Sequence, residues 1–244
     1  MSRWKASGVY LLLSVAVAGV VLVFSLTVWY PWPLFEAAGG GGLIFILLGV
    51  DVVLGPFITL IIFKPGKKGL KFDLTVLASL QFAALVYGIH TVYLARPVYL
   101  VFTVDRFELV AAKDLDPQDL EKVTRDEFKR PPLGRPRYAA AVSPGDPGER
   151  SKILDSALQG KDLQMYPQYY VPYEQEAQNA LRRAKNLSII LERDPGPVQL
   201  YLNSAARSQE SVKFLPLSAP KKDAAVLLDA VSGAPLEIVL VNPW

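Results

Sequence analysis

The sequence predicts a membrane protein with three N-terminal transmembrane α-helices followed by an α+β extracytoplasmic (periplasmic) domain. Three observations predict this fold class. Long apolar runs are confined to the first part of the 244-residue chain, basic residues flank those runs unevenly, and the rest has the frequent charges and prolines of a soluble domain. We place the division at residue 96, with residues 1–96 as the transmembrane domain and residues 97–244 as the periplasmic domain.

The three predicted spans cover about residues 8–28, 43–63 and 72–94. Each approaches the roughly 20 apolar residues that a helix needs to cross a bilayer. The first run is too long for the apolar part of a cleaved signal peptide, and no small-residue cleavage site follows it, so we predict an uncleaved anchor. The loop after it carries aromatic side chains that favour the headgroup region of a membrane: Trp29, Tyr30, Trp32 and Phe35.

The orientation of the spans follows from the basic residues around them. Arg3 and Lys5 precede the first span, and the loop after that span has no basic residue. Four lysines crowd the loop after the second span: Lys64, Lys67, Lys68 and Lys71. The excess of lysine and arginine on the cytoplasmic side of membrane proteins then predicts an inner-membrane protein with a cytoplasmic N-terminus. The domain after Arg96 is predicted to be periplasmic.

Composition argues against several classes of function. Residues 97–244 carry 19 basic and 20 acidic side chains, so the domain has no excess of positive charge for binding nucleic acid. The chain has no cysteine and one histidine, His90, which falls within the third predicted span. Motifs for a serine nucleophile, a zinc site or a dinucleotide are lacking. We therefore expect no enzymatic activity and no cofactor.

Residues 97–244 show strand and helix patterns without regular alternation, which favours α+β. The aromatic stretch Met165–Tyr173 is typical either of an interface or of a core with an ordered loop. The segment 98–111 is either a hairpin or one bent strand. The other expected elements are helices over 118–128, 148–158 and 174–186, strands over 138–142 and 212–217, an ambiguous segment over 198–206, and a hairpin over 224–241.

An intramembrane site is predicted around Asp51 in the second span. A carboxylate at the centre of a membrane helix costs about 2.5–3.5 kcal/mol on insertion scales, so it should face protein or water. Asp51, Gly55 and Thr59 recur every four residues and share one helix face. Pro56 cannot donate a backbone hydrogen bond, which predicts a kink at the middle of this span.

A second polar stripe occurs in the third span, where Thr75, Ser79, Ala83 and His90 share a face. Asp51 and His90 both fall in the outer half of the bilayer, which allows them to pair. The candidate intramembrane partner-binding residues are Asp51, Gly55, Pro56, Thr59 and His90. The alternative is a structural polar clamp, because small and polar stripes commonly hold transmembrane helices together.

Five stretches of the chain carry a family resemblance. They are the start MSRWKA, residues 49–56 (GVDVVLGP), residues 63–74 (FKPGKKGLKFDL), residues 95–108 and the ending Ile238–Trp244. Together these stretches resemble the TfpX/TfpZ family of type IV pilin accessory proteins. The resemblance covers the whole chain and is densest over residues 1–110. It implies an inner-membrane accessory protein or chaperone for type IV pilin, without a cofactor or a known active site.

The resemblance implies type IV pilin, and possible contacts with other pilus-assembly proteins, as the partners of the chain besides the lipid bilayer. A pilin subunit waiting in the membrane has an apolar helix and a periplasmic head, and a chain with both a membrane part and a soluble domain is able to meet both. Three alternatives remain open. They are a membrane-anchored periplasmic ligand sensor, a membrane enzyme that uses Asp51 and His90, and a structural subunit of a larger membrane complex.

Overall fold

The computed structural model describes residues 2–42, 50–64 and 67–244, with the side chains of Arg3, Val50 and Asp51 left out. The chain divides into two compact units. The helical unit comprises Met1–Trp29 and Gly40–Ala95, and the sheet unit comprises Tyr30–Gly39 and Arg96–Trp244.

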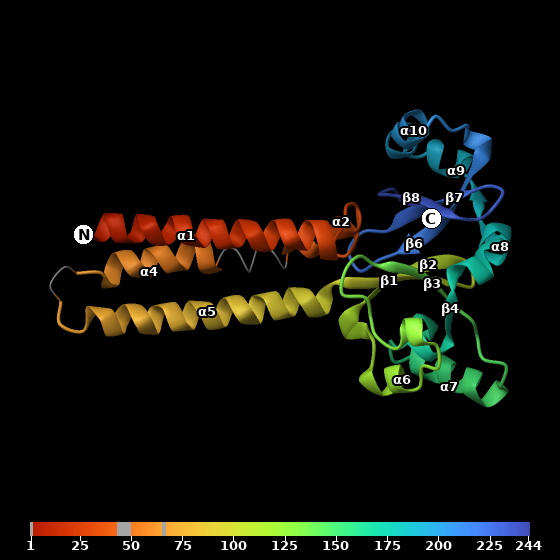
Figure 1. The fold of residues 1–244 in the computed structure, drawn as a ribbon. Coiled ribbons are helices and arrows are strands. Elements are labelled where there is room, and N and C mark those ends of the chain that lie inside the picture. The colour runs from red at the N-terminus through yellow and green to blue at the C-terminus, as the bar shows by residue number, and fades with distance from the viewer. Residues whose placement is uncertain (1, 43–49, 65–66) are drawn as a thin grey trace. The chain divides into compact units, whose positions relative to one another are not determined.

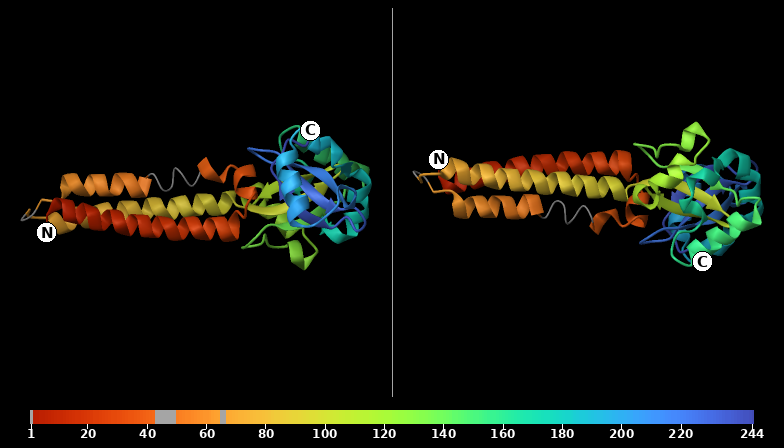
Figure 2. Two further views of the ribbon diagram at one scale, coloured as in Figure 1. Left: turned by 90° about the horizontal axis from the view of Figure 1, so that it is seen from above. Right: turned by 90° about the horizontal axis from the view of Figure 1, so that it is seen from below.

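The helical unit contains α1 (Arg3–Phe24), α4 (Gly55–Ile62) and α5 (Leu70–Ala95), which run side by side in Figures 1 and 2. α1 continues through a π-helical segment, Ser25–Trp29. By length and composition, two described helical stretches are able to cross a membrane, Trp4–Trp29 and Leu70–Ala95. They correspond to the first and third predicted spans.

The second predicted span, over residues 43–63, is not confirmed as a full membrane-crossing helix. Residues 43–49 lie outside the described residues, and the described part contains a shorter apolar helix, Val52–Ile62. This part begins with a π-helical segment, Val50–Leu54, and Pro56 follows in the first turn of α4. Because Pro56 has no N–H for the carbonyl of Val52, regular α-helical hydrogen bonding is interrupted there.

The sheet unit is built on a mixed eight-stranded sheet with the order β4-β3-β1-β2-β6-β7-β8, and β5 pairs with β6 at the side of this path. β1 pairs in parallel with β3, β2 pairs in parallel with β6, and the other pairs are antiparallel. The strands are β1 (Pro97–Thr103), β2 (Arg106–Ala111), β3 (Arg137–Ala141), β4 (Tyr170–Pro172), β5 (Lys185–Asn186), β6 (Val212–Ser218), β7 (Ala224–Asp229) and β8 (Pro235–Val239). The segment 98–111 is therefore a hairpin, and the α/β mixture predicted for this part of the chain is confirmed.

Both faces of the sheet are buried. β7 shows this most clearly, because Val226 and Leu228 belong to one core cluster while Ala225 and Leu227 belong to another. The first cluster includes residues of α2 (Leu34–Ala37) and α8 (Tyr173–Arg183), and the second includes residues of α9 (Ser188–Leu191) and α10 (Pro195–Ser204). A strand buried on both faces has a continuous apolar sequence, as β7 does. Further helices are α6 (Pro117–Glu121) and α7 (Pro147–Ala157).

The helix predicted over 118–128 is shorter than expected. α6 ends at Glu121, and a 3₁₀ turn over Asp126–Phe128 follows. The interruption brings both Val123 and Phe128 into the core cluster beneath β1 and β3. Burial of these two side chains therefore overrides the helical propensity of the segment.

The segment Tyr30–Gly39 packs into the sheet unit, although the sequence suggested a loop at the membrane surface. Tyr30, Leu34 and Ala37 are buried. The carbonyl of Ala37 accepts hydrogen bonds from the backbone N–H groups of Lys221 (3.0 Å) and Lys222 (3.3 Å). These backbone bonds and the buried apolar side chains hold the segment to the loop before β7.

The aromatic stretch Met165–Tyr173 contributes to the core. Tyr170 and Tyr173 are buried, and the ring of Tyr173 lies 5.5 Å from that of Phe107. Burial raises the pKa of the Tyr170 hydroxyl well above its ordinary value. The structure therefore supports the second of the two interpretations of this stretch, a core segment with an ordered loop.

Replacing Tyr173 by phenylalanine is expected to lower the free energy of unfolding of the sheet unit by about 1–2 kcal/mol. The Tyr173 hydroxyl donates to the buried carbonyl of Gly233 at 2.7 Å, and that carbonyl would lose its side-chain donor. Urea unfolding of the full chain in detergent measures the change. Tyr201→Phe is the control, since Tyr201 is only half-buried. Equal losses of unfolding free energy in the two variants would contradict a stabilising role for the hydrogen bond from Tyr173 to Gly233.

Candidate functional site

Three of the predicted intramembrane residues hold helices of the chain together. Gly55, Pro56 and Thr59 are buried in α4, and only 3% of the Thr59 surface is exposed. The Thr59 hydroxyl donates to the carbonyl of Gly55 at 2.9 Å, within the helix. The Ser7 hydroxyl of α1 donates to the carbonyl of Pro56, also at 2.9 Å. Small residues and interhelical hydrogen bonds of this kind are what holds apolar helices at close range.

Side chains of both α1 and α5 reach Gly55 on α4. A Cβ atom at this position would lie 2.2 Å from Nε2 of Gln81 on α5 and 2.6 Å from Cε1 of Tyr10 on α1. Only glycine therefore fits without a shift of its neighbours. The contacts match the polar-clamp alternative, while a contact of Gly55, Pro56 or Thr59 with another protein stays a prediction.

Sequence reasoning missed Ser7, Tyr10 and Gln81. The available signal was Gln81, the one amide side chain in the third predicted span. Both polar atoms of this amide are buried and have no hydrogen-bond partner among the described residues. An unpaired amide is costly in an apolar environment, so the packing around Gly55 must offset that cost.

The structure gives no support to the predicted pairing of Asp51 with His90. The side chain of Asp51 lies outside the described residues, while His90 is exposed on α5. The buried residues of α5 are Leu77 and Val92, which lie on the same helix face as Gln81. At 100° per residue, His90 lies on roughly the opposite face. The pairing therefore stays a prediction, while the polar stripe of α5 lies on the helix face turned away from Gly55 of α4.

The stripe of α5 is therefore an uncovered surface. Thr75, Ser79, Ala83 and His90 are all exposed. They form a line of small or polar side chains along a helix that also exposes large apolar groups, such as Leu80, Phe82 and Val86. A face of this composition is typical of contact between helices in an apolar environment.

The sheet unit offers a groove at the edge strand β8. Its walls are the loop residues Trp32 and Pro33, α10, and residues 237–240 at the end of β8, and its volume is about 330 Å³. The side chains of Trp32 and Leu200 are exposed at 68% and 73%. An extended partner segment binds a sheet edge through backbone hydrogen bonds, and apolar pockets beside the edge hold its side chains. The groove at β8 offers apolar groups of this kind.

A second, more polar groove of about 490 Å³ lies near Trp244 and is lined by Glu36 and Lys222, which form an ion pair at 2.6 Å. The indole N–H of Trp244 donates to Asp223 at 2.7 Å. The guanidinium of Arg106 lies 5.5 Å from the centre of the Trp244 ring, a cation–π contact. These contacts fix the ring against the domain, so the groove has a rigid wall.

The hairpin that carries β8 is stabilised by Asp229. Its carboxylate accepts from Arg207 at 2.8 Å and from the backbone N–H groups of Val231 (3.1 Å) and Ser232 (2.9 Å). The bond from Arg207, followed by those from Ser232 and Val231, lowers the pKa of Asp229 far below its ordinary value. The charged form is therefore favoured in the folded state.

Asp229→Asn is expected to lower the urea midpoint of unfolding at neutral pH, and the gap between its midpoint and that of the unchanged protein should narrow in acid. Because the pKa of Asp229 is depressed on folding, its contribution to stability is complete above the unfolded value, about 4, and is lost progressively as the pH falls from there toward the much lower folded value. Urea titrations at about pH 7 and pH 3 measure both gaps. A gap that widens in acid would refute the assignment.

Among the described residues, no group of three or more His, Cys, Asp or Glu side chains could hold a metal ion. The features that remain are an apolar helical unit with an uncovered stripe, and a mixed-sheet unit with two surface grooves. These features are typical of a binding protein that contacts other molecules through a helix face and a sheet edge.

Comparison with known proteins identifies the family. Residues 1–39 match the family model described as fimbrial assembly protein FimB. The fimbrial assembly protein of serogroup I from Dichelobacter nodosus is 31% identical over 211 residues, 86% of this chain and 78% of the relative. Its serogroup E1 counterpart is 31% identical over 219 residues, 87% and 85% of the two chains. The chain belongs to the family of fimbrial assembly proteins. No solved structure matches it.

Proposed function

We propose that this chain is an inner-membrane accessory protein that assists the assembly of type IV fimbriae by holding a pilin subunit before or during its addition. The relatives are named as fimbrial assembly proteins, and the sequence resembles type IV pilin accessory proteins. In this proposal the helical unit contacts the apolar helix of the pilin, and the sheet unit contacts its head. The role requires no catalysis.

The observation that carries the proposal is the outward apolar surface of the helical unit. α5 has 26 residues, of which Leu77 and Val92 are buried. Along α1, large side chains such as Leu12 and Val20 are more than 70% exposed. A contiguous apolar surface of this size is not stable in water, so lipid or apolar helices must cover it. Insertion in a bilayer satisfies this requirement.

We further propose three spans, with the N-terminus in the cytoplasm and the sheet unit in the periplasm. The basic residues at the ends of the helices support this orientation, since Lys64 to Lys71 flank the loop before α5. Once α5 is inserted in the bilayer, its exposed stripe faces the lipid phase, where a pilin helix is able to reach it. The stripe consists of Thr75, Ser79, Ala83 and His90.

Deletion of the gene in a fimbriated strain tests the role directly. Surface fimbriae should be reduced, and expression of the full chain should restore them, as counted by electron microscopy. Pilin should still be produced in the deletion strain, because assembly is the affected step. Full fimbriation without the gene would contradict the proposal.

The orientation has a separate test. A reporter enzyme that is active only outside the cytoplasm is fused after Trp244. Activity of the fusion is expected. A fusion to a fluorescent protein that matures only in the cytoplasm provides the opposite readout, and fluorescence from that fusion would place the sheet unit on the wrong side for contact with a pilin head.

A further inference from the structure

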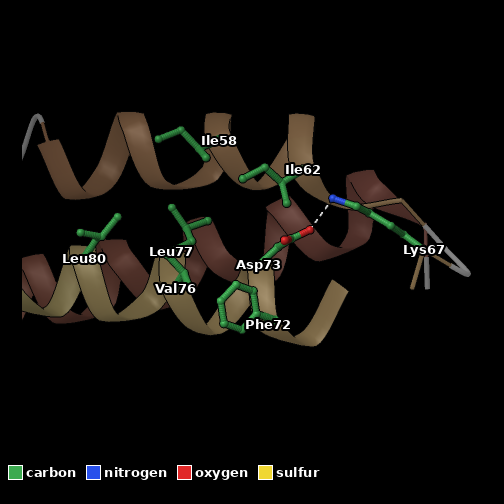
Figure 3. Close-up of a pocket in the computed structure, with 8 residues that line it drawn as sticks. All are labelled: Ile58, Ile62, Lys67, Phe72, Asp73, Val76, Leu77 and Leu80. Carbon is green, nitrogen blue, oxygen red and sulfur yellow. Dashed lines mark hydrogen bonds and ion pairs between the residues drawn. The ribbon is translucent and has the colours of Figure 1, made fainter. Parts of the chain in front are cut away.

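A groove between α4 and α5 lies beside the lysine-rich loop. Its volume is about 360 Å³, and its apolar walls are Ile58 and Ile62 of α4 and Phe72, Val76, Leu77 and Leu80 of α5. Figure 3 shows Ile58, Ile62, Leu77 and Leu80 directed into the space between the two helices, while the ring of Phe72 lies against α5. Phe72 and Leu80 are 72% and 65% exposed, so the groove is open at its side.

The chain segment beside the groove is strongly basic. Lys67 and Asp73 both line the groove and form an ion pair at 2.5 Å, which Figure 3 marks at the groove's mouth. Lys64, Lys68 and Lys71 are exposed and form no ion pair with a described residue. The four lysines and Asp73 together leave a net charge of +3 in this segment.

The charge and the apolar walls point to an occupant that is anionic at one end and hydrocarbon at the other. The groove extends over Phe72 to Leu80, about 12 Å along the helix at 1.5 Å per residue. That length is too short for a membrane-crossing helix, which needs about 20 residues. The length of the groove suits the part of a lipid acyl chain nearest the headgroup, which would place the phosphate at the level of the lysines.

We propose that the groove between α4 and α5 binds an anionic glycerophospholipid, with one acyl chain along the apolar walls and the phosphate near Lys64 and Lys68 of the adjoining loop. The ion pair of Lys67 with Asp73 neutralises the carboxylate that would otherwise repel the phosphate. Basic residues beside grooves between membrane helices are a recognised source of affinity for anionic headgroups. The proposal rests on the proposed insertion of the helical unit in a membrane.

The test is lipid binding by the full chain, purified in a neutral detergent and observed by native mass spectrometry. Phosphatidylglycerol is expected to bind with saturation and about tenfold more tightly than phosphatidylcholine. Lys64→Gln and Lys68→Gln should each weaken the binding of phosphatidylglycerol about fivefold, since a basic residue near an anionic surface contributes about 1 kcal/mol. Lys5→Gln is the matched control and should have no effect, because Lys5 is exposed on α1 and does not belong to the loop between α4 and α5.

A second variant tests the apolar walls. Leu80→Trp fills the groove and should weaken the binding of both lipids. Leu12→Trp, at an exposed position of α1 outside the groove, should change the binding of neither lipid. Excess inorganic phosphate should not displace the lipid. Equal affinity for the two lipids, no effect of Leu80→Trp, or displacement by phosphate alone would each overturn the proposal.

This experiment is separate from the test of function. Lipid binding in detergent depends on neither pilin nor orientation in the membrane, so its failure would leave the fimbrial role intact. Conversely, a strain that stays fimbriated without the gene would leave a positive lipid measurement unchanged.

Discussion

Replacing Gly233 by alanine is expected to lower the free energy of unfolding of the sheet unit by about 3 kcal/mol or more. Gly233 has φ +73° in the turn between β7 and β8, a conformation that costs an alanine about 1–2 kcal/mol. A Cβ atom there would also lie 2.4 Å from the carbonyl oxygen of Ala177 in α8, and backbone atoms cannot move aside. The turn would have to leave α8.

Hydrogen exchange of the full chain measures this loss, read in peptides that contain α8 and the β7–β8 hairpin. Gly160→Ala is the matched control, because Gly160 has φ +90° with no neighbouring atom within 4 Å of the added Cβ. The control isolates the backbone strain, about 1–2 kcal/mol. Equal losses in the two variants would show that the contact with α8 contributes nothing.

Gly55→Ala is expected to destabilise the helical unit by about 1–3 kcal/mol, although alanine normally favours a helix over glycine. The added Cβ would overlap the amide of Gln81 and the ring of Tyr10. The amide is the end of a flexible side chain and is able to move, while the ring requires α1 to shift. Unfolding of the full chain by dodecyl sulfate in mixed micelles measures the cost.

Two further variants make this prediction specific. Gly19→Ala on α1 has no atom within 4 Å of its added Cβ, so it should be neutral or slightly stabilising. Gln81→Ala in the Gly55→Ala background removes one of the two overlaps and should restore part of the lost stability. If Gly55→Ala behaves like Gly19→Ala, the three helices do not converge at Gly55.

Local sequence signals predicted the elements that depend on local rules. The strand character of 98–111 follows from two β-rich runs around Asp105, although the sequence left a hairpin and one bent strand open. The helix over 148–158 follows from apolar residues that share one face, and the structure adds a cap, because Asp146 accepts from the N–H of Glu149 at 2.8 Å. The antiparallel pairing of β7 with β8 follows from the short turn that contains Gly233. In each case the residues that decide the structure are neighbours in sequence.

The features that sequence could not supply depend on distant parts of the chain. The parallel pairing of β1 with β3 and the packing of Leu34 beneath the sheet join segments far apart in sequence. The rotation of α5 has the same origin. Spacing places Thr75 and His90 on one face, but only the position of α4 decides that this face is outward and that Gln81 is inward.

The most direct measurement of the central claim is a disulfide between the chain and pilin in intact membranes. Because the chain has no cysteine of its own, Ser79→Cys places one thiol in the exposed stripe of α5, and Ala78→Cys places one beside it on a different exposed face. Cysteines are scanned along the apolar helix of the pilin. We predict an adduct from position 79 that greatly exceeds any from position 78. Equal adducts from both positions, or none from position 79, would contradict contact between pilin and this stripe.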